Sequence, residues 1–123
     1  MKVKLRQLVN SSQALSRLMA QPMHAVVAFS LSRIARLIEP ELKAYDESRV
    51  KLLKEYGEPT EADPTRYEFQ SPEKAQSFAD ELNALLEQEV EGEFKPMTLE
   101  SLAKAEISAA DVLLLDWLIE SDD

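Results

Sequence analysis

The chain of 123 residues contains no cysteine, only two glycines and a single histidine. Without cysteine it can form no disulfide and no thiolate metal site, and it has no cysteine nucleophile. Gly57 and Gly92 lie 35 positions apart, too far to form a glycine-rich phosphate loop. His24 stands alone, so only a lone catalytic base would remain possible, and its place beside Pro22 favours an ordinary residue at a helix start. We therefore expect a protein that is not an enzyme and that uses no cofactor or metal.

Long hydrophobic runs are also missing. The longest apolar stretch, residues 25–38, is interrupted by two serines and two arginines, whereas a membrane span needs about 20 uninterrupted apolar residues. The first residues alternate charged and apolar side chains and lack the apolar core of a secretion signal. The sequence predicts a cytoplasmic protein with no membrane partner.

Acidic residues are absent before Glu39, whereas that stretch carries six basic ones. Residues 1–60 hold 10 basic and 6 acidic residues, a net charge of +4, and residues 61–123 hold 4 and 17, a net charge of −13. Such a split can act within the folded monomer, drive head-to-tail self-association, or present two surfaces to different partners. Direct nucleic-acid binding is not expected, because the pI is about 4.6 and the basic region holds few aromatic residues.

The first half of the chain has the signals of a strand and two helices. Residues 2–6 alternate as a half-buried strand does, and Asn10 is the predicted cap of a helix that ends near residue 21. A long helix is predicted over residues 23–56, closed by Gly57, with apolar residues recurring every three or four positions. Pro40 lies inside it and predicts either a kink near Leu37 or two separate helices.

The second half begins with a predicted exposed loop over residues 57–65 and a strand over residues 65–70. Ser71 and Pro72 start a helix that is expected to run to about Val90. An edge strand is predicted over residues 93–97, and Ser108 caps a last helix that should reach about Ile119. These elements predict one domain spanning residues 1–123. Its fold class is α+β, mainly α: a long helix, either straight or kinked, antiparallel to a second one, two shorter helices and a small sheet of two or three strands.

The last predicted helix is apolar on nearly all sides, so one of its faces could contact a partner. Trp117, Leu114 and Leu118 are the candidate apolar anchors, although a helix buried within the domain explains the same residues equally well. Arg33 and Arg36 are expected to pair with the acidic C-terminal helices, within the chain or across a subunit boundary.

Glu87 and Glu91, four residues apart on a predicted helix, should face the same side. They lack a third metal ligand, so a solvated surface is the expected explanation. The alternative is an acidic array with further glutamates that imitates DNA and occupies a basic groove of another protein. The rest of this array is Glu81, Glu89, Glu93 and Glu100.

The run from Ile34 to Lys43, the segment Lys54-Glu55-Tyr56-Gly57, the helix carrying Phe78 and the strand with Phe94 follow one another in a particular order. This order resembles a family of small proteins of unknown function encoded by tailed bacteriophages and prophages. The resemblance spans most of the chain and implies expression in a bacterial cytoplasm, with a role in assembly or against host machinery. It supplies no catalytic or binding residues.

The sequence therefore predicts a small, phage-type protein-interaction module that acts in assembly or as an adaptor. Its partner is expected to be a protein, with a second copy of the same chain as one candidate. The alternative is an acidic inhibitor that binds a host nucleic-acid-binding protein, or a defence or transcription enzyme.

Overall fold

A computed structural model of the protein describes residues 2–92 and 96–120. Its helices in this part of the chain are α1 (Leu5–Met19), α2 (Ala25–Tyr56), α3 (Pro72–Leu86) and α4 (Ala109–Leu114). The strands are β1 (Lys2–Lys4), β2 (Gly57–Pro59), β3 (Tyr67–Phe69), β4 (Glu89–Glu91), β5 (Met97–Thr98) and β6 (Ile119–Glu120). The predicted α+β class, mainly α, is confirmed.

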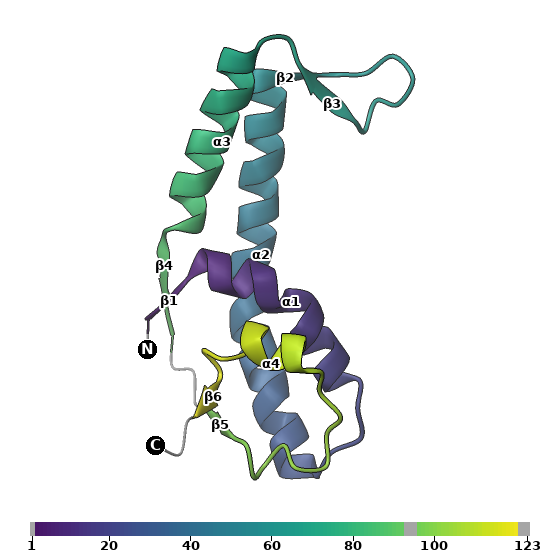
Figure 1. Cartoon of the computed structure of the whole chain (residues 1–123), viewed down its shortest axis with the longest axis vertical. Helices are drawn as coiled ribbons and strands as arrows, with labels where there is room; N and C mark the ends of the chain where they lie inside the picture. Colours follow the sequence, from purple (N-terminus) through teal and green to yellow (C-terminus); the bar gives the residue numbers. More distant parts are fainter. Residues whose placement is uncertain (1, 93–95, 121–123) are drawn as a thin grey trace.

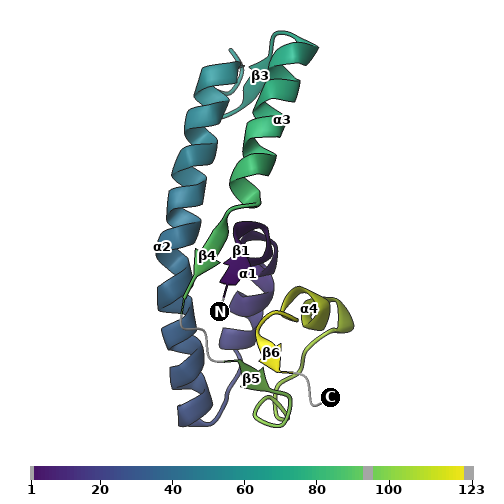
Figure 2. The same cartoon turned by 90° about the vertical axis from the view of Figure 1, so that its left-hand side faces the viewer.

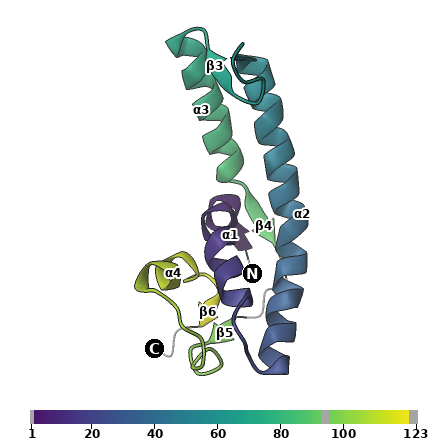
Figure 3. The same ribbon diagram turned by 90° about the vertical axis from the view of Figure 1, so that its right-hand side faces the viewer.

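Helix α2 runs along the molecule, and α3 returns antiparallel beside its C-terminal half, as predicted (Figure 1). Helix α1 packs against the N-terminal half of α2, and α4 packs against α1. Two views from opposite sides show α1 between α2 and α4 (Figures 2 and 3). We call residues 46–84 the arm, and the remaining described residues, 2–45, 85–92 and 96–120, the base.

The strands form three pairs in place of one small sheet. β1 and β4 are antiparallel, with Val3 opposite Val90, and β2 and β3 form an antiparallel hairpin at the tip of the arm. β5 and β6 are parallel, with Met97 opposite Ile119. Each pair joins segments that lie beside different helices, so the pairs cannot merge into one sheet.

The hydrophobic core lies entirely in the base. Its side chains come from β1, α1, the first half of α2 and the C-terminal segment, and Leu8 and Leu115 are completely buried. Helix α3 has no buried residue at all. The buried apolar residues are Val3, Leu5, Leu8, Ala14, Leu15, Leu18, Leu31, Ile34, Ile38, Met97, Leu102, Leu115 and Leu118.

Several predicted helix ends are confirmed. The Ser71 and Ser108 hydroxyls accept hydrogen bonds from the backbone N–H groups of Lys74 (3.2 Å) and Asp111 (3.1 Å). Helix α2 ends at Gly57, whose backbone is extended and continues into β2. A Cβ there would lie 3.0 Å from the Leu53 carbonyl oxygen, so close backbone approach explains the glycine.

Of the two alternatives predicted at Pro40, a kink or two separate helices, the second is wrong, because the helix is continuous from Ala25 to Tyr56. Proline removes one backbone donor, whose acceptor would be the carbonyl of Arg36. Both residues are exposed, so water can satisfy that carbonyl. Burial of the opposite side of α2 then keeps the helix intact.

The start of α1 differs from the prediction. The helix begins at Leu5, and Asn10 lies inside it. In place of an Asn10 cap, the Gln7 side chain accepts a hydrogen bond from the Lys4 backbone N–H at 3.1 Å. Burial of Leu5 and Leu8 extends the apolar stripe of α1 toward the N-terminus and determines this start.

The ends of α3 and α4 were predicted too far along the chain. Helix α3 stops at Leu86, because Val90 lies in β4 and pairs with β1. Helix α4 stops at Leu114, and turns lead to β6, where Ile119 pairs with Met97. Of the predicted strand 93–97, Met97 begins β5, whereas residues 93–95 lie outside the described part of the chain.

Candidate functional site

Several basic side chains of the N-terminal region form ion pairs with acidic side chains of the second half of the chain. Glu87 accepts hydrogen bonds from Lys4 Nζ (2.7 Å) and Arg6 Nε (3.2 Å), and Lys2 lies 3.8 Å from Glu89. The hydrogen bond from Lys4, followed by that from Arg6, holds the pKa of Glu87 below its ordinary value. The basic N-terminus is therefore tied to the segment that follows α3.

A second ion pair links α1 to α4. Arg17 donates two hydrogen bonds to Asp111, from Nε at 2.9 Å and from Nη2 at 2.6 Å. These bonds lower the pKa of Asp111, whose side chain is only 13% exposed. This fork-like pair orients α4 on α1.

Glu87 and Glu91 do not form the acidic pair predicted from their spacing. Helix α3 ends before both of them, and Glu91 lies in β4 opposite Lys2. The i,i+4 geometry of a helix therefore does not apply to this pair. Glu87 is a structural ion-pair partner, and Glu91 is exposed at a strand edge.

The three candidate anchors of the C-terminal segment lie at different depths. Leu118 is 1% exposed and belongs to the core. Trp117 is half-buried, and its indole N–H donates to the Ser11 hydroxyl at 3.1 Å. Leu114 is 39% exposed and its neighbour Leu113, which the sequence analysis did not single out, is 78% exposed.

The surface of α4 thus carries an apolar group with an acidic residue beside it. Val112, Leu113 and Leu114 are exposed, and the backbone N–H of Asp116 bonds to the carbonyl of Leu113. This bond keeps Asp116 in the turn that continues the helix, where its side chain is exposed. At 100° per residue Leu114 lies 200° from Val112, whereas Val112, Leu113 and Asp116 share one side of this segment. We call Val112, Leu113 and Asp116 the α4 face.

A second exposed apolar group lies on the first half of α2. Val26 is 78%, Phe29 61% and Leu37 46% exposed. Their spacing of three, then eight residues places them on one side of the helix together with Arg33, which lies between them. We call Val26, Phe29, Arg33 and Leu37 the α2 face.

The α2 face is turned away from the core. Leu31, Ile34 and Ile38 on the same helix are buried, and at 100° per residue they lie on roughly the opposite side. The Arg33 guanidinium carbon lies 5.8 Å from the centre of the Phe29 ring, within reach of a cation–π contact.

The two arginines of this region are not bound in the way the sequence suggested. Among the described residues neither Arg33 nor Arg36 forms an ion pair, and both are exposed. The expected pairing with acidic C-terminal helices is thus not made within the described chain. The sequence analysis noted these arginines but missed the apolar residues beside them, although the spacing 26, 29, 33 and 37 was a usable signal.

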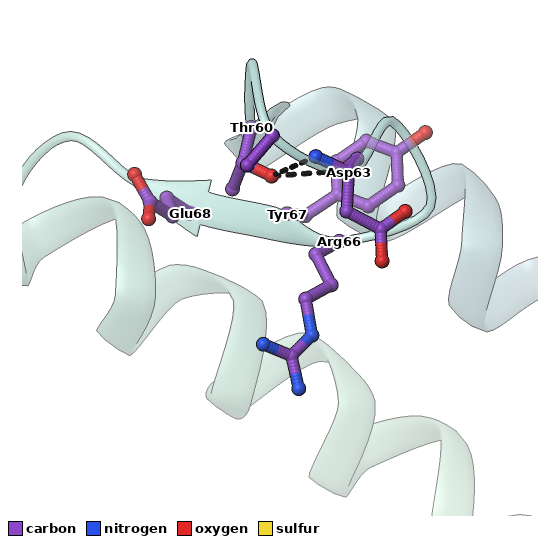
Figure 4. Close-up of a pocket in the computed structure, with 6 residues that line it drawn as sticks. Thr60, Asp63, Arg66, Tyr67 and Glu68 are labelled. Carbon is purple, nitrogen blue, oxygen red and sulfur yellow. Dashed lines mark hydrogen bonds between the residues drawn. The ribbon is translucent and has the colours of Figure 1, made fainter.

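The arm contains a shallow hollow of about 510 Å³ beside the β2–β3 hairpin (Figure 4). Thr60 and Asp63 hydrogen-bond to each other across the loop, and Asp63 also accepts from the Thr65 hydroxyl and backbone N–H. The bonds from the Thr65 hydroxyl and backbone N–H lower the pKa of Asp63. Arg66 points away from Asp63, so the polar groups of the hollow serve the loop itself and do not converge on a ligand.

Within residues 2–92 and 96–120, no three His, Asp or Glu side chains lie close enough to hold a metal ion together. In the same part of the chain, no helix has the length and apolar character needed to cross a membrane.

The α2 and α4 faces are therefore the candidate functional site. Comparison of the chain with protein-family models, with curated proteins and with solved structures found no match.

Proposed function

We propose that this protein is a non-catalytic protein-interaction module that acts in assembly or as an adaptor. The observation that carries the proposal is the pair of exposed apolar groups on the α2 face and the α4 face. Single exposed apolar residues are ordinary, whereas groups of them flanked by charge are typical of protein-binding surfaces. The bacterial cytoplasm and a phage context belong to the proposal through the resemblance described above.

The position of these groups adds support. Both lie on the base, whose core fixes the helices that carry them. An exposed phenylalanine on a rigid helix can bind a partner with little loss of conformational freedom. The three most exposed large apolar side chains of the described residues, Val26, Leu113 and Phe29, are divided between the two faces.

The alternative proposal is an acidic inhibitor that binds a host nucleic-acid-binding protein. The ion pairs weigh against it, since Glu87 and Glu89 of the acidic array contact lysine and arginine side chains of the N-terminus. Their negative charge is partly compensated inside the chain and is less available to a basic groove.

The proposal is tested by capture from a nuclease-treated bacterial lysate with the tagged full-length chain, at low and at high salt. We expect specific partners that persist at high salt and that are lost with Phe29→Asp or Leu113→Asp. Leu99→Asp is the matched control, because Leu99 is 53% exposed but belongs to neither face. Partners that are equally retained by all variants would contradict the proposal. Partners lost only at high salt would favour the acidic inhibitor.

A further inference from the structure

The α2 face and the α4 face point away from the molecule on opposite sides of α1. Helix α1 lies between α2 and α4 in both side views (Figures 2 and 3). The buried residues of α2 are turned toward this core, and Leu115 and Leu118 at the end of α4 are buried as well. The two exposed faces therefore cannot meet within one chain.

The two faces are complementary in charge. The α2 face contains Arg33 and is flanked by Arg36, and the nearest acids along that helix, Glu39 and Glu41, come only after Leu37. The α4 face contains Asp116, for which the described part of the chain supplies no ion-pair partner. Each face thus combines apolar side chains with a charge that its own chain leaves uncompensated.

We propose that the chain self-associates head to tail, with the α4 face of one copy docking on the α2 face of the next. This inference rests on the proposed function and specifies its partner as a second copy. Val112 and Leu113 cover the apolar part of the α2 face, and Asp116 meets Arg33 or Arg36. Such a contact joins two different surfaces, so each copy of a pair keeps its other surface free until the assembly closes into a ring or continues as a chain.

Symmetric pairing is disfavoured by the same charges. Two α2 faces would bring the arginines of one copy against those of the other, and two α4 faces would bring together the Asp116 carboxylates. Like charges placed opposite each other at an interface oppose association, whereas the head-to-tail arrangement pairs opposite charges.

The test is a mixing experiment with full-length variants, followed by analytical ultracentrifugation up to about 1 mM, where even millimolar dissociation constants are detected. The wild type should grow in mass with concentration. Phe29→Asp and Leu113→Asp should each stay monomeric, since each lacks one of the two surfaces. A mixture of the two should form a dimer and nothing larger, because only one intact surface remains on each chain.

Circular dichroism of each variant verifies folding, and Asp116→Lys offers a second, milder change of the α4 face. Asp116→Lys and Arg33→Glu should each weaken association by about tenfold or more, whereas the chain that carries both should recover it, because every interface again pairs opposite charges. Lys51→Glu, on the arm half of α2, is the control and should change nothing.

A wild type that remains monomeric at the highest concentration would overturn the inference, as would a mixture of the two aspartate variants that stays monomeric. Loss of association by only one of these variants would also overturn it, since that result indicates symmetric pairing. The two proposals fail separately. If self-association is absent but lysate partners are lost with the same variants, the inference is overturned and the proposed function stands, because the module then binds another protein through these faces.

Discussion

The base and the arm are built from the same long helix but are stabilised differently. In the base, α2 buries Leu31, Ile34 and Ile38 almost completely against α1 and the C-terminal segment. In the arm, the same helix meets only α3 and the hairpin, and its inward side chains are half-buried. A pair of helices can bury one stripe each, whereas a third layer closes the core.

The difference shows where stability and recognition reside. The base carries both candidate faces on elements fixed by a shared core, whereas the arm relies on contacts such as that between Phe69 and Phe78, whose ring centres are 5.2 Å apart. Local opening is expected where few apolar groups are buried. The arm should therefore open before the base unfolds.

The largest expected effect is in the core of the base. Leu31→Ala should lower the free energy of unfolding by about 2–5 kcal/mol, because a fully buried leucine leaves a cavity. Leu52 lies on the same helix but is half-buried in the arm. Leu52→Ala should therefore lower the free energy of unfolding by clearly less than Leu31→Ala. Urea denaturation of both variants measures the difference. Equal losses would remove the distinction between the two regions.

A smaller effect is expected from Phe78→Ala in the arm. We expect a loss of about 1–2 kcal/mol, since this side chain is half-buried and a fully buried phenylalanine would cost roughly 3–5 kcal/mol. Hydrogen exchange should show faster exchange in α3 and in the arm half of α2, with α1 unchanged. Uniformly faster exchange throughout the chain would mean that arm and base unfold as one unit.

Within the base, Ser11→Ala tests the bond that docks the tryptophan. The buried Ser11 hydroxyl accepts from Trp117 and donates to the carbonyl of Gln7 at 2.6 Å. Loss of this hydroxyl should lower the free energy of unfolding by about 0.5–1.5 kcal/mol and alter the tryptophan fluorescence. Ser16→Ala is the matched control, because Ser16 makes the same kind of bond to its own helix, to the carbonyl of Ser12, but is exposed. Similar changes in both variants would contradict a specific docking role.

The smallest expected effect is the dependence of stability on pH in the acidic range. The folded pKa values of Glu87 and Asp111 are lowered, so the stability they contribute is present above their unfolded pKa values and is lost as the pH falls through the folded ones. Melting temperatures should therefore decline below about pH 4, the ordinary carboxyl range. Arg17→Gln should flatten this decline. An unchanged pH profile in that variant would show that its bond to Asp111 contributes little.

The order of the helices along the chain was predictable, because the signals that mark helix ends come from residues close together in the sequence. Ser71, Ser108 and Gly57 mark ends that depend on a hydroxyl or on the lack of a side chain next to the backbone. The candidate site was predictable only in part. Arg33 was noted, but a sequence contains two apolar stripes on α2 and does not say which one a neighbouring helix covers.

The sequence by itself determined the helical class, the continuous apolar periodicity of α2 and the separation of positive from negative charge along the chain. Only the tertiary structure decided that Val90 and Ile119 lie in strands, paired with Val3 and Met97, and not in the helices predicted to reach them. It also decided that Leu118 is buried while Leu113 is exposed. The physical reason is that strand pairing and burial depend on residues far apart in the chain, whereas capping and periodicity depend on near neighbours.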